Sequence, residues 1–127
     1  MTQNGLVRSR GRILLLDDDA DAVLFATHVL AAGGHFTVEH TADPSVALRA
    51  VARDGCDLVL TEADLPGLNC RELVTAMRQL APRLPIVVLT ACLQAGAEAD
   101  ALCELTDSYL TKPVPADQLL ATVTRLL

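Results

Sequence analysis

The stretch DLVLTEADLPG, residues 57–67, joins an apolar run, a carboxylate and a turn. The run at 58–61 is too short for a helix and is bounded by turn signals, which is typical of a buried β-strand. Glu62 follows this run directly, and Pro66 with Gly67 fits a tight turn. A carboxylate at the end of a buried strand therefore needs a structural or functional reason.

Short apolar runs alternate with longer segments of helical periodicity along the chain, with a repeat of about 20 to 25 residues. This alternation is typical of βαβ units and predicts a parallel sheet with helices packed on it. We expect strands at 12–16, 36–40, 58–61, 86–90 and 108–111, and helices at 20–32, at 44–54, from 70 onward, at 95–105 and at 115–127. These elements fill the chain and leave no linker or low-complexity segment.

Residues with capping chemistry mark several of the expected helix ends. Gly33 and Gly34 can close the first helix, because glycine adopts the left-handed conformation of a C-cap. Asp43 followed by Pro44 is typical of an N-cap and the first helical position of the second helix. Asn69 can cap the third helix in the same way as Asp43. The predicted boundaries thus depend on local backbone chemistry as well as on periodicity.

The composition limits the size and the class of the protein. At 127 residues the chain forms one domain, and with 51% hydrophobic but 2% aromatic residues its core consists of aliphatic side chains. The net charge of −6 argues against a nucleic-acid partner and against an anionic membrane surface. No apolar run is long enough to span a bilayer, and the N-terminus lacks the apolar region of a signal peptide. We therefore expect the domain in the cytoplasm.

The cysteines carry no signature of a metal or redox site. Cys56, Cys70, Cys92 and Cys103 contain no C-x-x-C pair, and no histidine stands at metal-ligand spacing from them. We expect them to be reduced thiols that are buried or half-buried.

The carboxyl ends of the expected strands carry a small set of polar residues. They are Asp17, Asp18 and Asp19 after the first strand, Glu62 after the third, Thr90 with Ala91 at the end of the fourth, and Lys112 with Pro113 after the fifth. Crossover helices place these ends along one edge of a parallel sheet, where open α/β folds carry their sites. Asp19 is equally a candidate N-cap of the first helix.

The charges of this set require compensation. Asp17, Asp18 and Glu62 would stand together against the single ammonium of Lys112, and carboxylates at such spacing cannot all stay ionised unaided. Either a proton is retained or a cation is bound. Oxygen ligands at a half-open sheet edge suit Mg²⁺, which takes one or two carboxylates and keeps several waters.

In this order and spacing, the residues resemble the receiver domain of two-component response regulators. The matching motifs are Asp17-Asp18 in ILLLDDDAD, Glu62 in TEADLPG, Thr90-Ala91 in IVVLTA and Lys112-Pro113 in YLTKPV, with Tyr109 at the position of the switch aromatic. The resemblance implies a flavodoxin-like α/β fold, in which a doubly wound, five-stranded parallel sheet forms the middle of three layers. It further implies a receiver domain at 12–127 after an N-terminal tail at 1–11.

The resemblance also implies a role for each site residue. Glu62 stands four residues before a proline, where the family carries its phospho-accepting aspartate. In an ordinary member, Asp18 and the acceptor hold Mg²⁺ with help from the backbone carbonyl at the Asp64 position. Lys112 and Thr90 receive the phosphoryl oxygens. The Mg²⁺ ligands expected here are therefore Asp18, Glu62 and Asp64.

Glutamate at the acceptor position departs from the family pattern. Its carboxylate is carried one extra C–C bond, about 1.5 Å, into the pocket, and a displacement near 1 Å can cost roughly a hundredfold in a positioned reaction. We therefore expect a receiver that works without phosphorylation. Glu62 would act as a permanent negative charge near Lys112 and Thr90 and bias the switch of Thr90 and Tyr109 towards an active-like arrangement, or the domain would use no switch.

Two other interpretations stay open at this point. In the first, the domain is phosphorylated on Glu62 itself or on Asp64. In the second, the chain is a phosphatase of the haloacid dehalogenase type, because Asp17 and Asp19 loosely resemble the first motif of that family. Against the phosphatase, no further acidic motif follows Lys112.

The resemblance places the partner surface on the fourth helix, the fifth strand and the fifth helix. The partner would be a histidine kinase or a downstream effector protein. Leu105-Thr106 replaces the Gly-Ala that the family usually has before the fifth strand, so we expect this surface to be reshaped. Since no output domain follows the last helix in the sequence, we expect a stand-alone signalling domain and not an enzyme.

Overall fold

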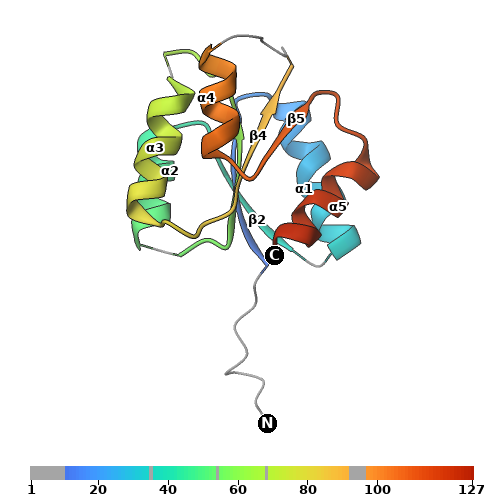
Figure 1. Ribbon diagram of the computed structural model, residues 1–127. Coiled ribbons are helices and arrows are strands. Elements are labelled where there is room, and N and C mark those ends of the chain that lie inside the picture. Colours follow the sequence, from blue (N-terminus) through green and yellow to red (C-terminus); the bar gives the residue numbers. More distant parts are fainter. Residues whose placement is uncertain (1–10, 35, 54, 68, 92–96) are drawn as a thin grey trace.

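Strands and helices alternate along the chain in the computed structural model, which describes residues 11–34, 36–53, 55–67, 69–91 and 97–127 (Figure 1). The strands are β1 (Arg12–Leu16), β2 (Thr37–Thr41), β3 (Leu58–Glu62), β4 (Ile86–Thr90) and β5 (Ser108–Thr111). The helices are α1 (Ala20–Gly34), α2 (Pro44–Arg53), α3 (Cys70–Leu80), α4 (Ala97–Leu105) and α5 (Ala116–Leu126). None of these helices has the length and apolar character needed to cross a bilayer.

The strands form one parallel sheet in the order β2-β1-β3-β4-β5. Helices α1 and α5 cover one face of the sheet, while α2, α3 and α4 cover the other (Figure 1). This doubly wound, three-layer arrangement confirms the predicted flavodoxin-like fold class. The strand order reverses between β1 and β3, and a crevice at the carboxyl ends of the strands is the expected place for a site.

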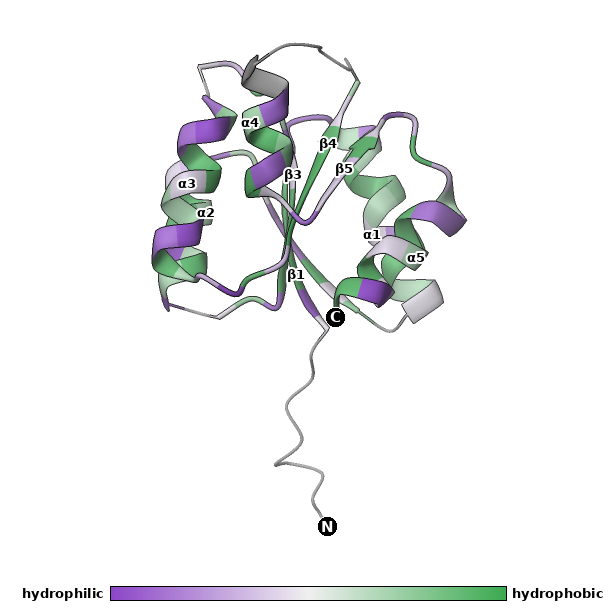
Figure 2. Cartoon of the chain, viewed as in Figure 1, coloured by the Kyte–Doolittle hydropathy of each residue, from purple (hydrophilic) through white to green (hydrophobic). Residues whose placement is uncertain are grey.

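Each face of the sheet has its own hydrophobic cluster. Along β1, Ile13 and Leu15 point into the cluster under α1 and α5, whereas Leu14 and Leu16 point into the cluster under α2, α3 and α4. Hydrophobic residues face inward from both helical layers (Figure 2). Because both faces are covered, β3 and β4 are buried at every position and are mostly apolar. This explains the continuous apolar run at 58–60, with which β3 begins.

The first helix ends later than the sequence predicts. It continues to Gly34, and neither Gly33 nor Gly34 has a positive φ, so the predicted left-handed stop at 33–34 is wrong. A β-carbon on Gly33 would lie 2.6 Å from a methyl carbon of Leu120 in α5. Gly33 therefore serves the close approach of α5 to α1 and not the termination of the helix.

Other boundaries agree with the prediction or differ slightly from it. Strand β2 begins one residue later than expected, at Thr37, and β3 extends one residue further, because Glu62 pairs with Leu89 of β4. The predicted caps are confirmed: Asp43 Oδ1 accepts the Ser45 amide at 2.9 Å, and Asn69 Oδ1 accepts the amide three residues on at 3.1 Å. The hydrogen bonds from Ser45 lower the pKa of Asp43.

A single arginine ties the end of α4 to the sheet. The guanidinium of Arg78 in α3 donates to the carbonyl of Leu105 at 3.0 Å, to the carbonyl of Leu84, and to Asp107 Oδ2 at 2.6 Å. The same carboxylate oxygen accepts the amide of Ile86 at 2.8 Å. Here Arg78 provides the donor for the last carbonyl of α4, at the place where the family usually has Gly-Ala.

Candidate functional site

The polar residues predicted at the strand ends meet at one edge of the sheet. Asp17 follows β1, Glu62 ends β3, Thr90 ends β4, and Lys112 follows β5. Side-chain contacts of Lys112 with Asp17 and Glu62 connect the ends of β5, β1 and β3, although Lys112 lies 95 and 50 positions from these residues in the sequence. The strand-end argument therefore located these residues correctly.

Lys112 is the centre of an ion-pair triad. Its Nζ atom donates to Asp17 Oδ2 at 2.8 Å and to Glu62 Oε1 at 2.7 Å. Asp17 is 1% exposed and Glu62 7% exposed, whereas the lysine is half-buried. Burial opposes the charge of Lys112, but its contacts with the two carboxylates outweigh that effect and raise its pKa. The ammonium therefore stays charged at neutral pH and compensates the buried carboxylates.

The remaining carboxylate oxygens of the triad bind the backbone. Oδ1 of Asp17 accepts the amide of Asp19 at 3.0 Å. Oε2 of Glu62 accepts the amides of Ala63 at 2.7 Å and Asp64 at 3.2 Å. Both oxygens of Glu62 are thus engaged, one by an ammonium and one by the following loop. The carboxylate at the end of this buried strand is a counter-ion of Lys112.

Thr90 donates its hydroxyl proton to a different carboxylate. Its Oγ1 lies 2.7 Å from Asp64 Oδ2, and Thr90 is fully buried while Asp64 is exposed. Tyr109, the predicted switch aromatic, is half-buried in β5 and packs against the cluster on the α2, α3 and α4 face. Asp64, and not Glu62, accepts the hydroxyl proton of Thr90. Any influence of Glu62 on this hydroxyl is therefore indirect.

Asp18 and Asp19 lie outside the triad. Asp18 is exposed in the loop after β1. Asp19 caps α1, because its carbonyl accepts the amide of Val23 at 3.0 Å and its Oδ1 accepts the amide of Asp21 at 3.0 Å. Of the two roles considered for Asp19, the capping role is the one that its contacts support.

In this arrangement Lys112 binds the Glu62 oxygen that would otherwise be open to a Mg²⁺ ion. Within the described ranges, no three or more His, Cys, Asp or Glu side chains are placed to hold a metal ion. Among the expected side-chain ligands, Glu62 is engaged by Lys112 and the backbone, and Asp18 is exposed. The metal site predicted at Asp18, Glu62 and the Asp64 position stays a prediction, and a Mg²⁺ ion there would have to compete with Lys112 for the glutamate.

Two features of the site were missed by the sequence analysis. His40 Nε2 lies 2.9 Å from the backbone oxygen of Asp17, and only the pairing of β2 with β1 reveals this proximity. A pocket of about 700 Å³ opens beside Asp17 and Lys112 and is lined mainly by apolar residues of α1 and of the β5–α5 connection, among them Phe25 and Val114. No local motif predicts such a pocket, because its walls come from distant segments.

Two of the cysteines, Cys56 and Cys70, should react slowly because their thiols are hard to deprotonate. Burial, together with the charges of Glu62 and Asp64, raises the pKa of Cys70 to about 11, and burial likewise raises the pKa of Cys56 to about 11. Cys103 is exposed, and Cys92 lies outside the described residues, so the expectation of buried or half-buried thiols is wrong for Cys103.

We expect iodoacetamide at pH 8 to alkylate Cys103 faster than Cys56 and Cys70. A thiol whose pKa rises by about two units loses roughly a hundredfold of its thiolate at this pH, and thiolate is the reactive form. Peptide mass spectrometry over time measures each rate. The same reaction in 8 M urea is the control, because unfolding should make the rates similar; equal rates in the folded protein would contradict the burial of the two thiols.

A scan against protein families matches residues 13–124 to the response regulator receiver domain. Among characterised relatives, the response regulator protein FleR of Pseudomonas aeruginosa is 30% identical over 115 residues, which cover 90% of this chain and 24% of FleR. The response regulator MprA of Mycobacterium leprae is 34% identical over 116 residues, which cover 91% of this chain and 50% of MprA. The chain thus spans half or less of the length of these relatives.

Solved structures show the same fold. A CheY-like response regulator receiver domain protein from Methanospirillum hungatei superposes with a TM-score of 0.82 at 26% identity, covering 92% of this chain and 93% of that one. The chemotaxis response regulator CheY4 of Vibrio cholerae gives a TM-score of 0.80 at 25% identity, with coverages of 92% and 98%. The family assignment also removes the phosphatase interpretation of Asp17 and Asp19. From the matched motifs, the sheet topology and these relatives, the chain belongs to the response regulator receiver domain family.

Proposed function

We propose that this receiver domain transmits its signal through protein contacts without being phosphorylated, because Glu62 occupies the acceptor position. The observation that carries the proposal is the 2.7 Å contact of Glu62 Oε1 with Lys112 Nζ. This contact gives Lys112 in the resting protein the negative partner that a phosphoryl group would otherwise provide. The domain is then a permanently set component of a two-component signalling system in the cytoplasm.

The geometry of Glu62 opposes its use as a phosphoryl acceptor. A carboxylate acts as a nucleophile through a free oxygen. Both oxygens of Glu62 are engaged, and the residue is 7% exposed, so a phosphodonor would have to displace either Lys112 or two backbone amides. Such a displacement leaves a buried ammonium or buried amides without their partner, which is costly.

As a substitute for a phosphoryl group, Glu62 is incomplete. A phosphoryl group brings a charge of about −1.5 to −2 and three acceptor oxygens, while a glutamate brings one charge and two oxygens. We infer that the resting site therefore has its own fixed arrangement, which a partner protein recognises as it stands.

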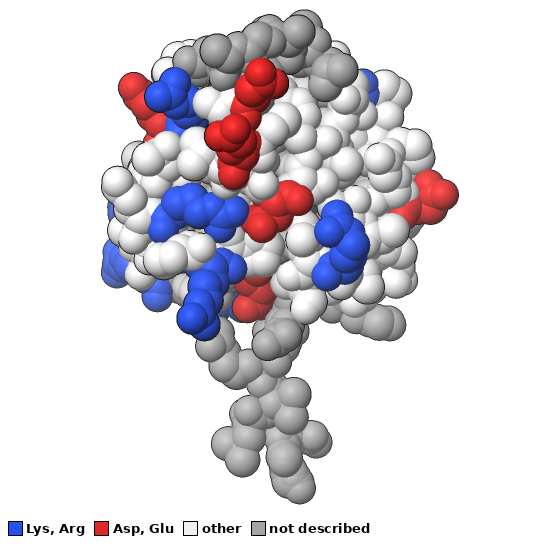
Figure 3. Space-filling model, in the orientation of Figure 1, with Lys and Arg blue, Asp and Glu red and all other residues white. Residues whose placement is uncertain are grey.

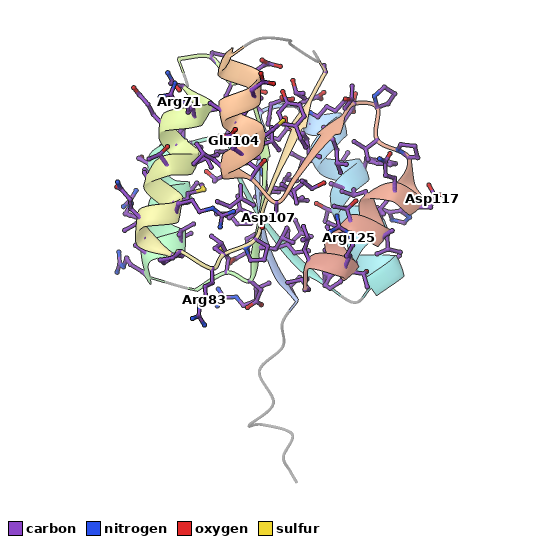
Figure 4. The ribbon with its side chains drawn as sticks, viewed as in Figure 1. Arg71, Arg83, Glu104, Asp107, Asp117 and Arg125 are labelled. Atoms are coloured by element: carbon purple, nitrogen blue, oxygen red, sulfur yellow. The ribbon has the colours of Figure 1, made fainter. Side chains whose placement is uncertain are left out.

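The proposed contact surface is the face formed by α4, β5 and α5. This face carries charges of both signs and no large single-sign field (Figure 3). Two acidic residues, Glu104 of α4 and Asp107, lie near the middle of this face, and the basic Arg125 lies on α5 (Figure 4). A mixed surface of this kind favours a specific protein partner over a polyanion. A histidine kinase or a downstream effector would be such a partner.

The test is a pair of titrations followed by amide chemical shifts at Glu62, Thr90, Tyr109 and Lys112. Mg²⁺ is added first, and beryllofluoride, a phosphoryl mimic, second. We expect neither to produce a saturable shift at these positions, because Lys112 and the backbone already hold the glutamate. A saturable, Mg²⁺-dependent shift at Thr90 and Tyr109 would overturn the proposal.

The alternative acceptors are distinguished by labelling with acetyl phosphate. A label that is acid-labile, sensitive to hydroxylamine and lost in Glu62→Gln would show that Glu62 accepts phosphate. A label lost in Asp64→Asn would point to the exposed Asp64. We expect no label on the unmodified protein.

A further inference from the structure

We infer that Asp64 is a positioning residue that holds the switch threonine, Thr90, in one rotamer, so that the site is set by two carboxylates and not by Glu62 alone. The inference rests on the proposed function and extends it to the regulation of the same site. Its starting point is the 2.7 Å hydrogen bond from Thr90 Oγ1 to Asp64 Oδ2.

The contact is one link of a closed ring of hydrogen bonds. Lys112 Nζ donates to Glu62 Oε1 at 2.7 Å, and the amide of Asp64 donates to Glu62 Oε2 at 3.2 Å. The side chain of Asp64 then accepts from Thr90, and the carbonyl of Thr90 accepts the amide of Lys112 at 2.7 Å. The ring joins the carboxyl ends of β3, β4 and β5. Glu62 thus positions the backbone of Asp64, and Asp64 positions Thr90.

In the hydrogen bond between Thr90 and Asp64, the threonine is the donor and the carboxylate is the acceptor. A threonine hydroxyl has a single proton to donate, and Thr90 is fully buried, so its hydrogen bond to Asp64 favours the rotamer that makes this contact. Asp64 is exposed, so its carboxylate can be approached from solvent while Thr90 cannot. Asp64 is therefore the most exposed member of the ring, and a change at Asp64 should alter the buried Thr90.

Glu62 and Asp64 contact different residues of the site. Glu62 compensates the ammonium of Lys112, and Asp64 accepts the hydroxyl proton of Thr90. By the resemblance, a single phosphoryl group would serve both Lys112 and Thr90. Here Glu62 at the end of β3 and Asp64 in the following loop perform these tasks in the unmodified chain.

The experiment compares Asp64→Ala with Asp64→Asn in the absence of Mg²⁺ and of any phosphodonor. Three-bond couplings of Thr90 report its χ1 rotamer, and ring and amide shifts report Tyr109. We expect Asp64→Ala to change the Thr90 rotamer populations and to shift Tyr109. Asp64→Asn should retain the native rotamer, because its side-chain oxygen still accepts the hydroxyl proton. Asp117→Ala, at the exposed start of α5, is the matched control and should change neither signal.

An unchanged Thr90 rotamer in Asp64→Ala would overturn the inference. A second measurement guards against a general loss of structure: in a Thr90→Val background, Asp64→Ala should cause no further shift at Tyr109, whereas additive shifts would show that Asp64 acts by another route. The phosphodonor titration tests the proposed function separately. A response to the donor in the unmodified protein would refute phosphorylation independence but would say nothing about the Thr90 rotamer. An unchanged rotamer in Asp64→Ala would refute the role of Asp64 but not the pairing of Lys112 with Glu62.

Discussion

Replacing Lys112 with methionine lowers the free energy of unfolding by about 3–5 kcal/mol at neutral pH, as expected when one partner of a buried ion pair is removed. The substitution keeps most of the apolar stem of the side chain but leaves two buried carboxylates, Asp17 and Glu62, without their ammonium. The loss should therefore exceed that of any exposed charge in the domain. Urea unfolding at pH 7, followed by circular dichroism, measures it.

Three controls identify the charge as the cause. Arg125→Met removes an exposed cation and should change stability by less than about 0.5 kcal/mol. Adding Glu62→Gln to Lys112→Met should restore part of the loss, because one buried charge disappears. The loss should also shrink as the pH falls towards the range in which carboxylates take up protons. A deficit that is the same at all pH values, or that the second substitution deepens, would show that packing and not charge is responsible.

The free energy of unfolding of the native protein should fall at high pH, where Lys112 loses its charge. The pKa of Lys112 is raised above its ordinary value of 10.5, so its contribution to stability is complete below pH 10.5 and is lost as the pH rises through the higher pKa of the folded state. The thiols of half-buried Cys56 and buried Cys70 act in the same direction: their raised pKa values make stability fall as the pH rises from their ordinary pKa of 9.0 to about 11.

Shortening the acceptor side chain, in Glu62→Asp, should raise the initial rate of labelling by acetyl phosphate on the order of a hundredfold. The shorter carboxylate retreats by about 1.5 Å, so it can no longer satisfy Lys112 and the loop amides in the present way, and one oxygen is released to act as a nucleophile. Radiolabel incorporation that hydroxylamine removes measures the rate. The substitution also exchanges one carboxylate for another and keeps the charge of the site.

Glu62→Gln is the matched control, because it retains the length of the glutamate and removes the nucleophilic carboxylate; it should not label. If Glu62→Asp labels no better than the parent, the length of the side chain is not the only obstacle. The next residue to replace would then be Asp64, whose contact with Thr90 would occupy the hydroxyl that a phosphoryl oxygen needs.

The local sequence pattern was sufficient to predict most strand bounds and the proximity of the site residues. The bounds of β1, β4 and β5 match the prediction, because each short run ends at or just before a polar residue. Asp17, Glu62 and Lys112 were brought together by a rule about parallel strands, which needs no knowledge of side-chain directions. The same rule placed Thr90 at the edge.

What the sequence could not provide depends on contacts between distant segments. The stop predicted at Gly33 failed because the glycine makes room for Leu120, which lies in the last helix. The acceptor of the Thr90 hydroxyl proton could not be foreseen either, since the spacing of Glu62 and Asp64 does not tell which carboxylate turns towards β4. Asp18 matched a family motif, yet its side chain is exposed. Such rotameric choices are settled by packing and charge in three dimensions.

The arginine that ties α4 to the sheet has a mechanical consequence. Because Arg78 binds the last carbonyl of α4 together with the entries to β4 and β5, any displacement of the helix that keeps these bonds is a swing about its Leu105 end. Arg78 is then the fulcrum of a lever, and the opposite end of α4, which lies towards the carboxyl edge of the sheet, travels furthest. The end of α4 at Leu105 would then stay in place while the end at Ala97 swings.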